Sequence, residues 1–360
     1  GIQTTVFRAG TVSEYIEPFS QDRTVYAVFA KSRERGQLPW ACTTEERNLM
    51  TSINSQVLDA RLPESSAGQI RTLRLVQSVN GEYSNFFGAS TAGTPADQAL
   101  VAAAINATLA RTNGTYEKDL AVHLDLTANT TLVWFYNPAT DPYTTLSNWN
   151  NELAAAIAAA GITPAMYDIG HMFGASGGGG NAGCIGCVCA ADHSKGRGIT
   201  SPADAIPQGD NFDIDYVAHE VGHQIGGNHT FSMSLESGGT HNVEVGSGVT
   251  IMGYAGITSF DVDDHSIDVW HERSIQQIQA NLPTRPCPAG GIITMVNNGP
   301  PVVAPLTNYT IPITTPFALT GSATDPQSDP LTYNWEQNDA ANSTVTGSNS
   351  PAFPTKLVGP

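Results

Sequence analysis

The chain of 360 residues has few charged side chains and no long apolar run. Asp, Glu, Lys and Arg make up only 14% of the residues, well below the usual quarter or so. The longest apolar stretches, near residues 99–110 and 153–162, are interrupted and alanine-rich. A membrane span needs about 20 consecutive apolar residues, so we expect no membrane partner.

Basic residues are scarce in one part of the chain only. Residues 1–74 hold nine Lys and Arg against eight Asp and Glu, whereas residues 75–360 hold seven against 25. An acidic body of this kind repels phosphate backbones and attracts hard cations such as Ca²⁺. We therefore expect no nucleic-acid partner, although solubility alone would also explain the acidity.

Composition and hydrophobic period divide the chain into three regions. Residues 1–70 contain short strands, such as 24–30, and end in a polar linker at 63–69. Residues 71–287 alternate strands with helices, which predicts an α/β layer. The expected elements of this region are strands at 73–79, 121–127, 131–136 and 168–173, and helices at 96–111 and 149–160.

A third region follows a linker rich in Pro and Gly beyond residue 283. Alternating residues from Ile292 onward predict an all-β unit over 292–360, which resembles the start of a PKD- or cadherin-like sandwich. At about 70 residues it is shorter than the roughly 100 of such folds, so we expect it to be incomplete.

The segment HEVGHQIGGNH has the spacing of a zinc site. His219 and His223 stand four residues apart, so on a helix both imidazoles project from one face. Glu220, between them, points to a metal-bound water rather than to the metal, as a general base must. Gly226 then ends the helix and lets His229 return as a third ligand. Three protein ligands and an open position are typical of catalytic zinc.

These residues, together with TIMGYAG at 250–256, resemble a metzincin metalloprotease with Met252 as its Met-turn. YDIGHMFG at 167–174 is similar to the edge strand that aligns the peptide in reprolysin-like (adamalysin-type) enzymes. The resemblance covers 71–287 and implies a mixed twisted sheet, an active-site helix and a zinc endopeptidase that needs no covalent intermediate. Thr230 differs, because it stands where that family typically carries Asp. The implied substrate strand consists of Ile169, Gly170, His171, Met172 and Phe173.

The resemblance also implies roles for residues outside the motif. Tyr254 lies two residues after Met252, where related enzymes use a tyrosine to stabilise the oxyanion, although ordinary packing would also explain it. Cys189 and Cys287 correspond to a disulfide pair. Asp168 matches a calcium ligand of the family, although its expected acidic partner is Arg74 here. The acidic positions 261–268 and 325–329 are other calcium candidates, or simply solvated faces.

Five cysteines suggest an oxidising compartment with one thiol left over. Cys184 and Cys187 are candidates for a second disulfide, and a metal site in this cluster is the alternative. Cys42 lies in the front region, residues 1–70. In many metzincin zymogens a propeptide cysteine occupies the zinc, so residues 1–70 resemble the end of a propeptide with Cys42 as its switch. A buried structural cysteine is the competing interpretation.

The sequence therefore predicts a secreted, monomeric zinc endopeptidase of extracellular polypeptides, made as a zymogen. Two alternatives remain: a catalytically silent zinc protein that serves binding or adhesion, and a zinc hydrolase of a non-peptide substrate. An intact Glu220 argues against the first, and the similarity of residues 167–174 to a peptide-aligning strand argues against the second.

Overall fold

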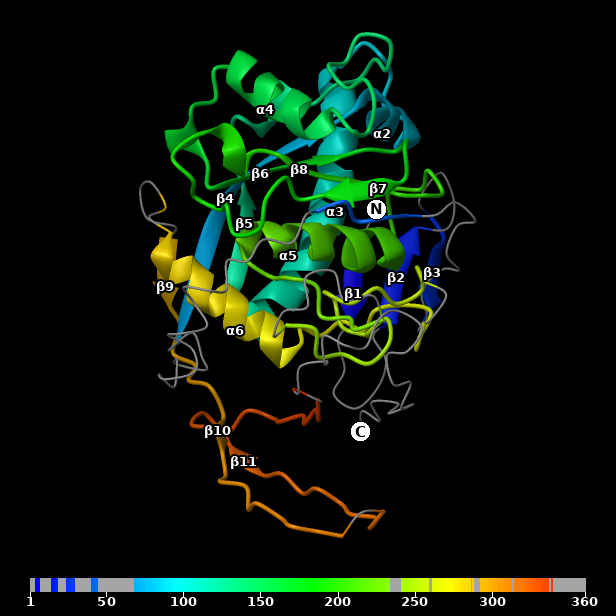
Figure 1. Ribbon diagram of the computed structural model, residues 1–360. Coiled ribbons are helices and arrows are strands. Elements are labelled where there is room, and N and C mark those ends of the chain that lie inside the picture. The colour runs from blue at the N-terminus through cyan, green and yellow to red at the C-terminus, as the bar shows by residue number, and fades with distance from the viewer. Residues whose placement is uncertain are drawn as a thin grey trace.

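The computed structural model describes residues 4–6, 14–18, 24–29, 40–44, 68–233, 241–258, 261–285, 287, 292–312, 314–336 and 338. A six-stranded sheet forms the centre of the molecule, with strand order β5-β4-β6-β8-β7 and with β9 also paired to β4 (Figure 1). Its strands are β4 (Gln69–Val79), β5 (Val122–Leu126), β6 (Ile169–Phe173), β7 (Gly179–Asn181), β8 (Gly198–Ser201) and β9 (Ile292–Met295).

The sheet is mostly parallel, with antiparallel strands at two places. Strands β5, β4, β6 and β8 run parallel, whereas β7 and β9 run antiparallel to their neighbours. All five residues of β6 are buried, as expected of a strand covered on both faces. The prediction that Ile169–Phe173 is an edge strand is wrong, because β6 is paired with β4 on one side and β8 on the other. The edge strand at the β8 end of the sheet is β7.

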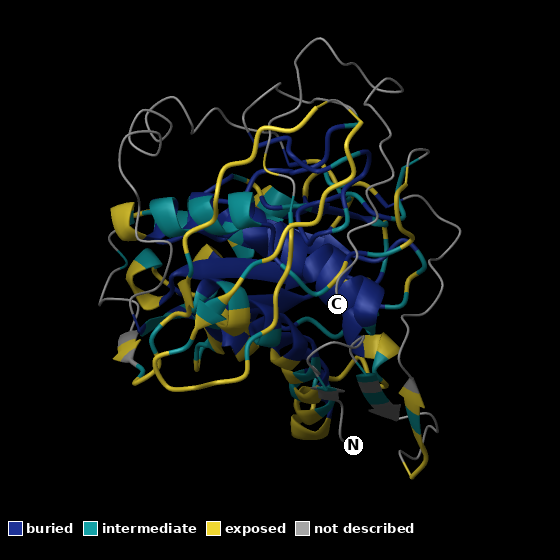
Figure 2. Cartoon of the chain, turned by 90° about the horizontal axis from the view of Figure 1, so that it is seen from below, coloured by how far each residue is buried: buried dark blue, intermediate teal, exposed yellow. Residues whose placement is uncertain are grey.

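Helices cover both faces of this sheet (Figure 1). Leu73, Leu75 and Phe173 face one hydrophobic cluster, which includes residues of α3, α5 and α6. Val76 and Met172 face the other cluster, with residues of α4. Burial is concentrated in this body (Figure 2). The helical elements are α2 (Gly81–Phe86), α3 (Pro95–Leu120), η1 (Thr130–Val133), α4 (Trp149–Ala159), η2 (Pro164–Met166), η3 (His193–Lys195), η4 (Asn211–Ala218), α5 (His219–Ile225), α6 (Glu272–Asn281) and η5 (Leu282–Thr284).

Helix α3 is longer than the predicted 96–111. It begins at a capping box, in which Thr94 and Asp97 each accept a backbone hydrogen bond from the other. It continues through the polar residues 111–115 because their side chains find buried partners: Arg111 pairs with Asp213 at 2.7 Å, and the Asn113 amide exchanges two hydrogen bonds with the backbone of Leu124. Tertiary contacts therefore outweigh the weak helix propensity of this stretch.

The predicted strand at 131–136 is wrong. Residues 131–133 belong to the 3₁₀ helix η1, because Thr130 exchanges hydrogen bonds with both backbone groups of Gln77 in β4. Only Trp134 bridges to Val79 in parallel fashion, and its indole donates to the Gln77 carbonyl at 2.9 Å. The turn therefore packs against the sheet without extending it.

The third region differs from its prediction in two ways. Ile292 begins β9, which pairs with β4 in the central sheet and does not start a separate sandwich. Among the described residues beyond it, the strands are β10 (Val302–Val303) and β11 (Ala323–Thr324), which form a single two-stranded ladder (Figure 1). The predicted PKD- or cadherin-like sandwich is therefore not supported.

The front region contributes a three-stranded antiparallel sheet of β1 (Thr4–Val6), β2 (Glu14–Pro18) and β3 (Tyr26–Phe29), which agrees with the strand expected near 24–30. The linker expected at 63–69 lies mostly outside the described residues. Within the described part of the chain, no helix is both long and apolar enough to cross a bilayer.

Candidate metal centre

Helix α5 carries the first two histidines of the motif. It continues η4 without a break, because Ala218 and His219 both have right-handed helical backbone angles at the junction. η4 is a π-helix, a form that often occurs at functional sites. His219 and His223 are fully buried, and their ring centroids lie 4.8 Å apart. One turn of helix therefore places both imidazoles on one side, as their spacing predicts.

Gly226 ends this helix as predicted. Its φ of 127° belongs to the region that favours glycine, and an added Cβ would lie 2.8 Å from the Cβ of Asn281. The chain then turns back and brings His229 to the other two histidines. The ring centroid of His229 lies 4.5 Å from that of His223. The predicted break and return are confirmed.

The three imidazoles direct their Nε2 atoms at one point. The Nε2 of His229 lies 2.9 Å from that of His223 and 3.1 Å from that of His219. The Nδ1 atoms of His219 and His223 lie 2.7 Å from the carbonyls of Ile251 and Gly227, which can only accept, so these Nδ1 atoms carry the protons. Burial lowers the pKa of His219 to about 3 and that of His223 well below its ordinary value. The Nε2 atoms of His219 and His223 therefore present lone pairs that converge on the Nε2 of His229.

This donor set fits zinc. With Zn–N bonds of about 2.0–2.1 Å, tetrahedral geometry requires N–N separations of about 3.3 Å, close to those of His219, His223 and His229. The backbone carbonyls on the Nδ1 atoms orient the rings and fix their tautomers, as is usual around metal ligands. Converging lone pairs without a cation would repel one another.

Cys42 completes the cluster. Its Sγ lies 3.6 Å from the Nε2 of His223, and one ligand atom from each of Cys42, His219, His223 and His229 lies within 4.8 Å of the others. A tetrahedral zinc with Zn–N of about 2.05 Å and Zn–S of about 2.3 Å has an N–S separation of about 3.6 Å. The thiol therefore stands where a fourth ligand would. Burial and then the nearby Glu220 carboxylate raise the pKa of this thiol, an effect that a cation would oppose.

Cys42 belongs to an extended segment, residues 40–44, whose side chains alternate between the protein and the surface. Trp40 and Thr44 are buried and Cys42 is partly buried, whereas Ala41 and Thr43 are exposed. The inward side chains each meet the site. Trp40 stacks on Tyr216, Cys42 faces the histidines, and the Thr44 hydroxyl donates to Glu220 at 3.1 Å.

The same segment pairs with the edge strand β7. The N–H of Thr43 donates to the carbonyl of Gly180 at 2.9 Å, and the N–H of Gly180 donates to the carbonyl of Ala41 at 3.0 Å. The bridge between Cys42 and Gly180 is parallel. Residues 40–44 therefore pair with the outer edge of β7, next to the metal-binding side chains.

Glu220 is buried beside the histidines. Its Oε2 accepts from Thr44, whereas its Oε1 has no hydrogen-bond partner within the described residues. Burial raises the pKa of its carboxyl to about 8, against hydrogen bonds from Cys42 and Thr44 that lower it. Gly180 lies so close that an added Cβ would be 2.2 Å from this Oε1. The edge strand therefore needs glycine here.

Tyr254 and Met252 lie on either side of the histidines. The Tyr254 ring packs on His229 with centroids 4.6 Å apart, and its hydroxyl donates to the carbonyl of Cys42 at 3.4 Å. Met252 is fully buried under α5, where a Cβ added at Gly222 would lie 2.7 Å from its sulfur. The N–H of Thr230 donates to the Met252 carbonyl at 3.1 Å, which joins this turn to the third histidine.

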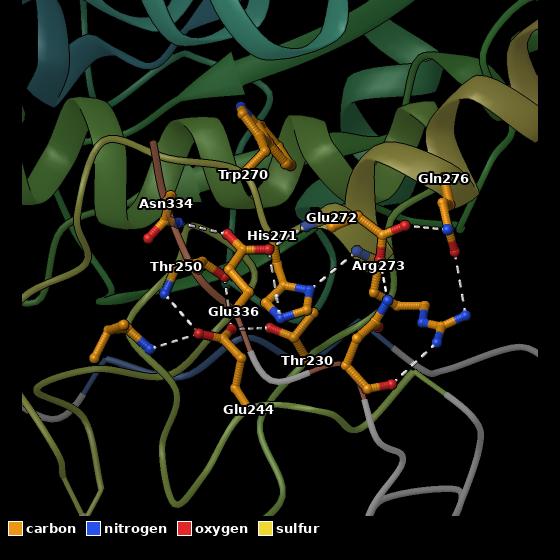
Figure 3. Close-up of polar contacts among 12 residues, drawn as sticks. Thr230, Glu244, Thr250, Trp270, His271, Glu272, Arg273, Gln276, Asn334 and Glu336 are labelled. Carbon is orange, nitrogen blue, oxygen red and sulfur yellow. Dashed lines mark hydrogen bonds and ion pairs between the residues drawn. The ribbon is translucent and has the colours of Figure 1, made fainter. Parts of the chain in front are cut away.

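The buried carboxylate of Glu244 joins the segment that contains Thr230 to the turn that contains Thr250 (Figure 3). Glu244 accepts hydrogen bonds from the hydroxyls of Thr230 and Thr250, and from the backbone N–H groups of Val249 and Thr250. Both carboxylate oxygens are thus occupied by donors from the segment after His229 and from the turn that carries Met252. The carboxylate that contacts Thr230 therefore comes from a residue 14 positions further along the chain.

The end of α5 is held by a loop that contains the clustered cysteines. The N–H groups of Gly186 and Val188 donate to the carbonyls of His223 and Gln224 at 2.8 and 3.1 Å. The Asn281 side chain donates to the Ile225 carbonyl at 2.8 Å. These contacts satisfy the carbonyls that a helix end leaves without partners.

The cysteine cluster forms disulfides. Cys189 is bonded to Cys287, which confirms the pair implied by the resemblance, and Cys184 is bonded to Cys187. Cys42 is the free cysteine. With the four others paired, the alternative of a metal site made from the cluster has no thiols to use.

The prediction of calcium at Asp168 is not supported. Both oxygens of this buried carboxylate are taken by Arg74, whose guanidinium donates at 2.8 and 3.0 Å and whose backbone N–H donates at 2.9 Å. The guanidinium supplies the positive charge that a cation would bring.

His171 is a buried packing residue. Its ring lies between the Gln224 side chain and the Thr200 hydroxyl, each 2.8 Å away. Gln224 follows His223 directly, and its amide also donates to the carbonyl of Gly170 at 2.9 Å. Through these bonds β6 positions the active-site helix, although it is not the strand that borders the site.

Comparison with known families agrees with this geometry. Residues 70–279, more than half of the chain, match the metallo-peptidase family M12B, reprolysin-like. The chain belongs to this family, and it is therefore a hydrolase of the zinc metallopeptidase type whose histidines fit the metal. No curated protein matches the chain.

Several residues around the site were missed from the sequence. Trp40 and Thr44 each lie two residues from Cys42. Had residues 40–44 been predicted as an extended strand, all three side chains would have been expected on the same side. The strand containing Gly180 carries no apolar alternation, so nothing in its sequence indicates a strand. Glu244 lies between two valines, a pattern that does not reveal a buried carboxylate.

Proposed function

We propose that the protein is a secreted zinc endopeptidase that cleaves extracellular polypeptides and is held latent by residues 40–44. The convergence of three buried Nε2 atoms beside Glu220 carries this proposal. Three histidines are the ligand set of a catalytic zinc, whose fourth position would be open once residues 40–44, as we propose, are removed.

Zinc held by the three histidines would polarise a peptide carbonyl and acidify water. Glu220 would accept the proton of the attacking water at a carboxylate oxygen and return it to the leaving amine nitrogen. Its Oε1 is already without a partner in the described part of the chain, and its Oε2 would be freed when Thr44 leaves. Tyr254, whose hydroxyl donates to the Cys42 carbonyl beside the site, is the residue that we propose as donor to the developing oxyanion.

The latency proposal rests on three contacts made by one short segment. Cys42 presents sulfur at the fourth position, Thr44 occupies the general base, and backbone hydrogen bonds to Gly180 cover the sheet edge. A peptide substrate needs the same three places. The alternative of a merely structural cysteine does not explain why the thiol faces three histidines.

A substrate would bind along β7 by adding a strand. Gly180 offers its N–H and its carbonyl at this edge, where they now bond Ala41 and Thr43. Release of residues 40–44 would free both groups for the backbone of a polypeptide. The substrate strand that we propose is therefore Gly179–Asn181, in place of the strand expected from the sequence.

The two disulfides support an extracellular location, since such bonds persist in oxidising compartments. We propose that residues 1–70 end a propeptide up to the start of β4 at Gln69, and that the protease extends beyond Cys287 to include β9, which pairs with β4. We also propose that the enzyme acts as a monomer.

The test is hydrolysis of quenched casein by the full chain, before and after limited proteolysis, with zinc content measured in parallel. Activity that appears on cleavage of the front region, follows one zinc per chain and is lost in Glu220→Gln supports the proposal. Glu117→Gln, a change at an exposed carboxylate, is the matched control. A chain that binds zinc but cuts no peptide in any form would refute the peptidase and favour a silent binding protein.

Latency is tested separately. Cys42→Ala in the uncleaved chain should release part of the activity, because Trp40 and Thr44 still hold the segment, and Cys42→Ala with Trp40→Ala should release more. The other four cysteines are paired in disulfides. A free thiol that is titrated in the wild type and is lost in Cys42→Ala is therefore that of Cys42. Unchanged basal activity in both variants would contradict the proposed switch.

A further inference from the structure

The side chain of Trp40 fills a pocket next to the histidines. It is only 3% exposed, and its ring stacks face to face on Tyr216, with centroids 4.4 Å apart and planes at 9°. Its ring is perpendicular to that of His219, with centroids 6.1 Å apart, and its Nε1 donates to the backbone carbonyl of Ser201 at 3.0 Å. The pocket therefore combines a flat aromatic wall with one hydrogen-bond acceptor.

This pocket belongs to the active site by position. Tyr216 lies three residues before His219 on the continuous helix, and Ser201 is the last residue of β8, which pairs with β7. Trp40 is two residues from Cys42 in an extended segment, so both side chains point to the same side. The residue facing the histidines and the residue in the pocket are thus neighbours on one strand face.

We propose that the activated enzyme uses this pocket to select an aromatic side chain of its substrate, with Trp and Tyr preferred over Phe and aliphatic residues. The inference rests on the proposed peptidase function and names its substrate class. When residues 40–44 leave, a peptide on the same edge presents a side chain to the wall of Tyr216, at the place that Trp40 vacates.

The preference follows from the two surfaces of the pocket. A flat ring can stack on Tyr216, whereas a branched aliphatic side chain cannot reproduce this contact. Trp and Tyr also carry a donor that can reach the Ser201 carbonyl, as the indole of Trp40 does. A Phe side chain excludes water and supplies no donor, so we expect it to be cleaved about tenfold less efficiently than Trp.

The first experiment digests a mixed peptide library with the proteolytically activated chain, with Glu220→Gln as the blank. The inference expects Trp and Tyr to be enriched at one fixed distance from the cleaved bond. Tyr216→Phe, which keeps the ring, should retain this enrichment, and Tyr216→Leu should reduce it about tenfold. Cleavage without aromatic enrichment would overturn the inference and leave the peptidase intact. Zinc binding without any cleavage would overturn both.

A second experiment needs no variant of the enzyme. Synthetic peptides of residues 40–44 with Cys42→Ala, so that no thiol is present, compete with a casein substrate for the activated chain. The version with Trp40 should inhibit about tenfold better than Trp40→Phe and about a hundredfold better than Trp40→Leu. Equal inhibition by the three peptides would show that the pocket does not select aromatic side chains.

Discussion

Replacing Glu244 should destabilise the protease and weaken its binding of zinc, although Glu244 is not itself one of the metal ligands. Its carboxylate accepts four buried hydrogen bonds, which join the segment after His229 to the turn that carries Met252 (Figure 3). In Glu244→Ala four buried donors lose their acceptor. At about 1 kcal/mol for each lost bond, we expect a loss of about 4 kcal/mol in the free energy of unfolding.

Two milder variants separate the carboxylate from its volume. Glu244→Gln keeps an oxygen for the backbone donors, and its amide can donate to the hydroxyls, so we expect a loss of about 1–2 kcal/mol. Thr230→Val keeps the shape of the side chain but removes its single hydroxyl donor, so it should cost about 1 kcal/mol. In the double variant with Glu244→Ala, most of the Thr230→Val effect should disappear, because the two side chains act through one bond.

The assay is unfolding by urea and by heat with zinc present, together with the zinc dissociation constant. A loss of about 4 kcal/mol lowers the melting temperature by about 10 °C in a domain of this size. Zinc affinity should fall with Glu244→Ala, because the same turn supplies the carbonyl of Ile251 that orients His219. Wild-type melting temperature and zinc affinity in Glu244→Ala would refute this reasoning.

Three further predictions concern the edge strand, pH and the site first expected to bind calcium. Gly180→Ala places a Cβ 2.2 Å from the Glu220 carboxylate, so activity of the cleaved enzyme should fall about a hundredfold in the casein assay, while zinc content stays unchanged. Burial lowers the pKa of His171 from 6.5 to about 4. As pH falls, His171 is therefore protonated in the unfolded chain before it is protonated in the folded protein. About 3 kcal/mol of stability, fully present above pH 6.5, is lost between about pH 6.5 and about pH 4. The urea-unfolding difference between wild type and His171→Gln should shrink by that amount over this range, and a constant difference would contradict the assignment. Arg74→Ala leaves the buried Asp168 carboxylate without its cation and should cost about 3 kcal/mol; Asp168→Asn in that background should recover part of it, and no recovery would rule out an unpaired charge as the cause.

The parts of the fold that the sequence predicted are those with a local period. The strand now seen at Gln69–Val79 and the helix at Trp149–Ala159 show their apolar patterns within a single window. The zinc motif is local as well, because helix geometry brings its first two histidines together and Gly226 needs a backbone that few other residues adopt.

The errors lie where strand partners decide the outcome. β6 has the composition of a strand, but its place between β4 and β8 depends on contacts far apart in the sequence. β7 is formed by two glycines and an asparagine, which carry no strand signal, and yet it borders the site. The linker before β9 predicts a separate domain, and composition cannot show that a strand returns to an earlier sheet.

The metal ligands depend on the rest of the fold more than their compact motif suggests. The ring of His219 is oriented by a carbonyl 32 residues away, and that of His223 by a carbonyl four residues away. The carbonyl of His223 is in turn held by the cysteine loop, which the Cys189–Cys287 bond joins to a segment 98 residues further along the chain. A preformed set of three converging imidazoles therefore exists only when the turn, the loop and the helix are packed together. Because an unfolded chain lacks this set, most of the free energy of zinc binding stabilises the folded protease, and its zinc affinity reports on contacts well outside the motif.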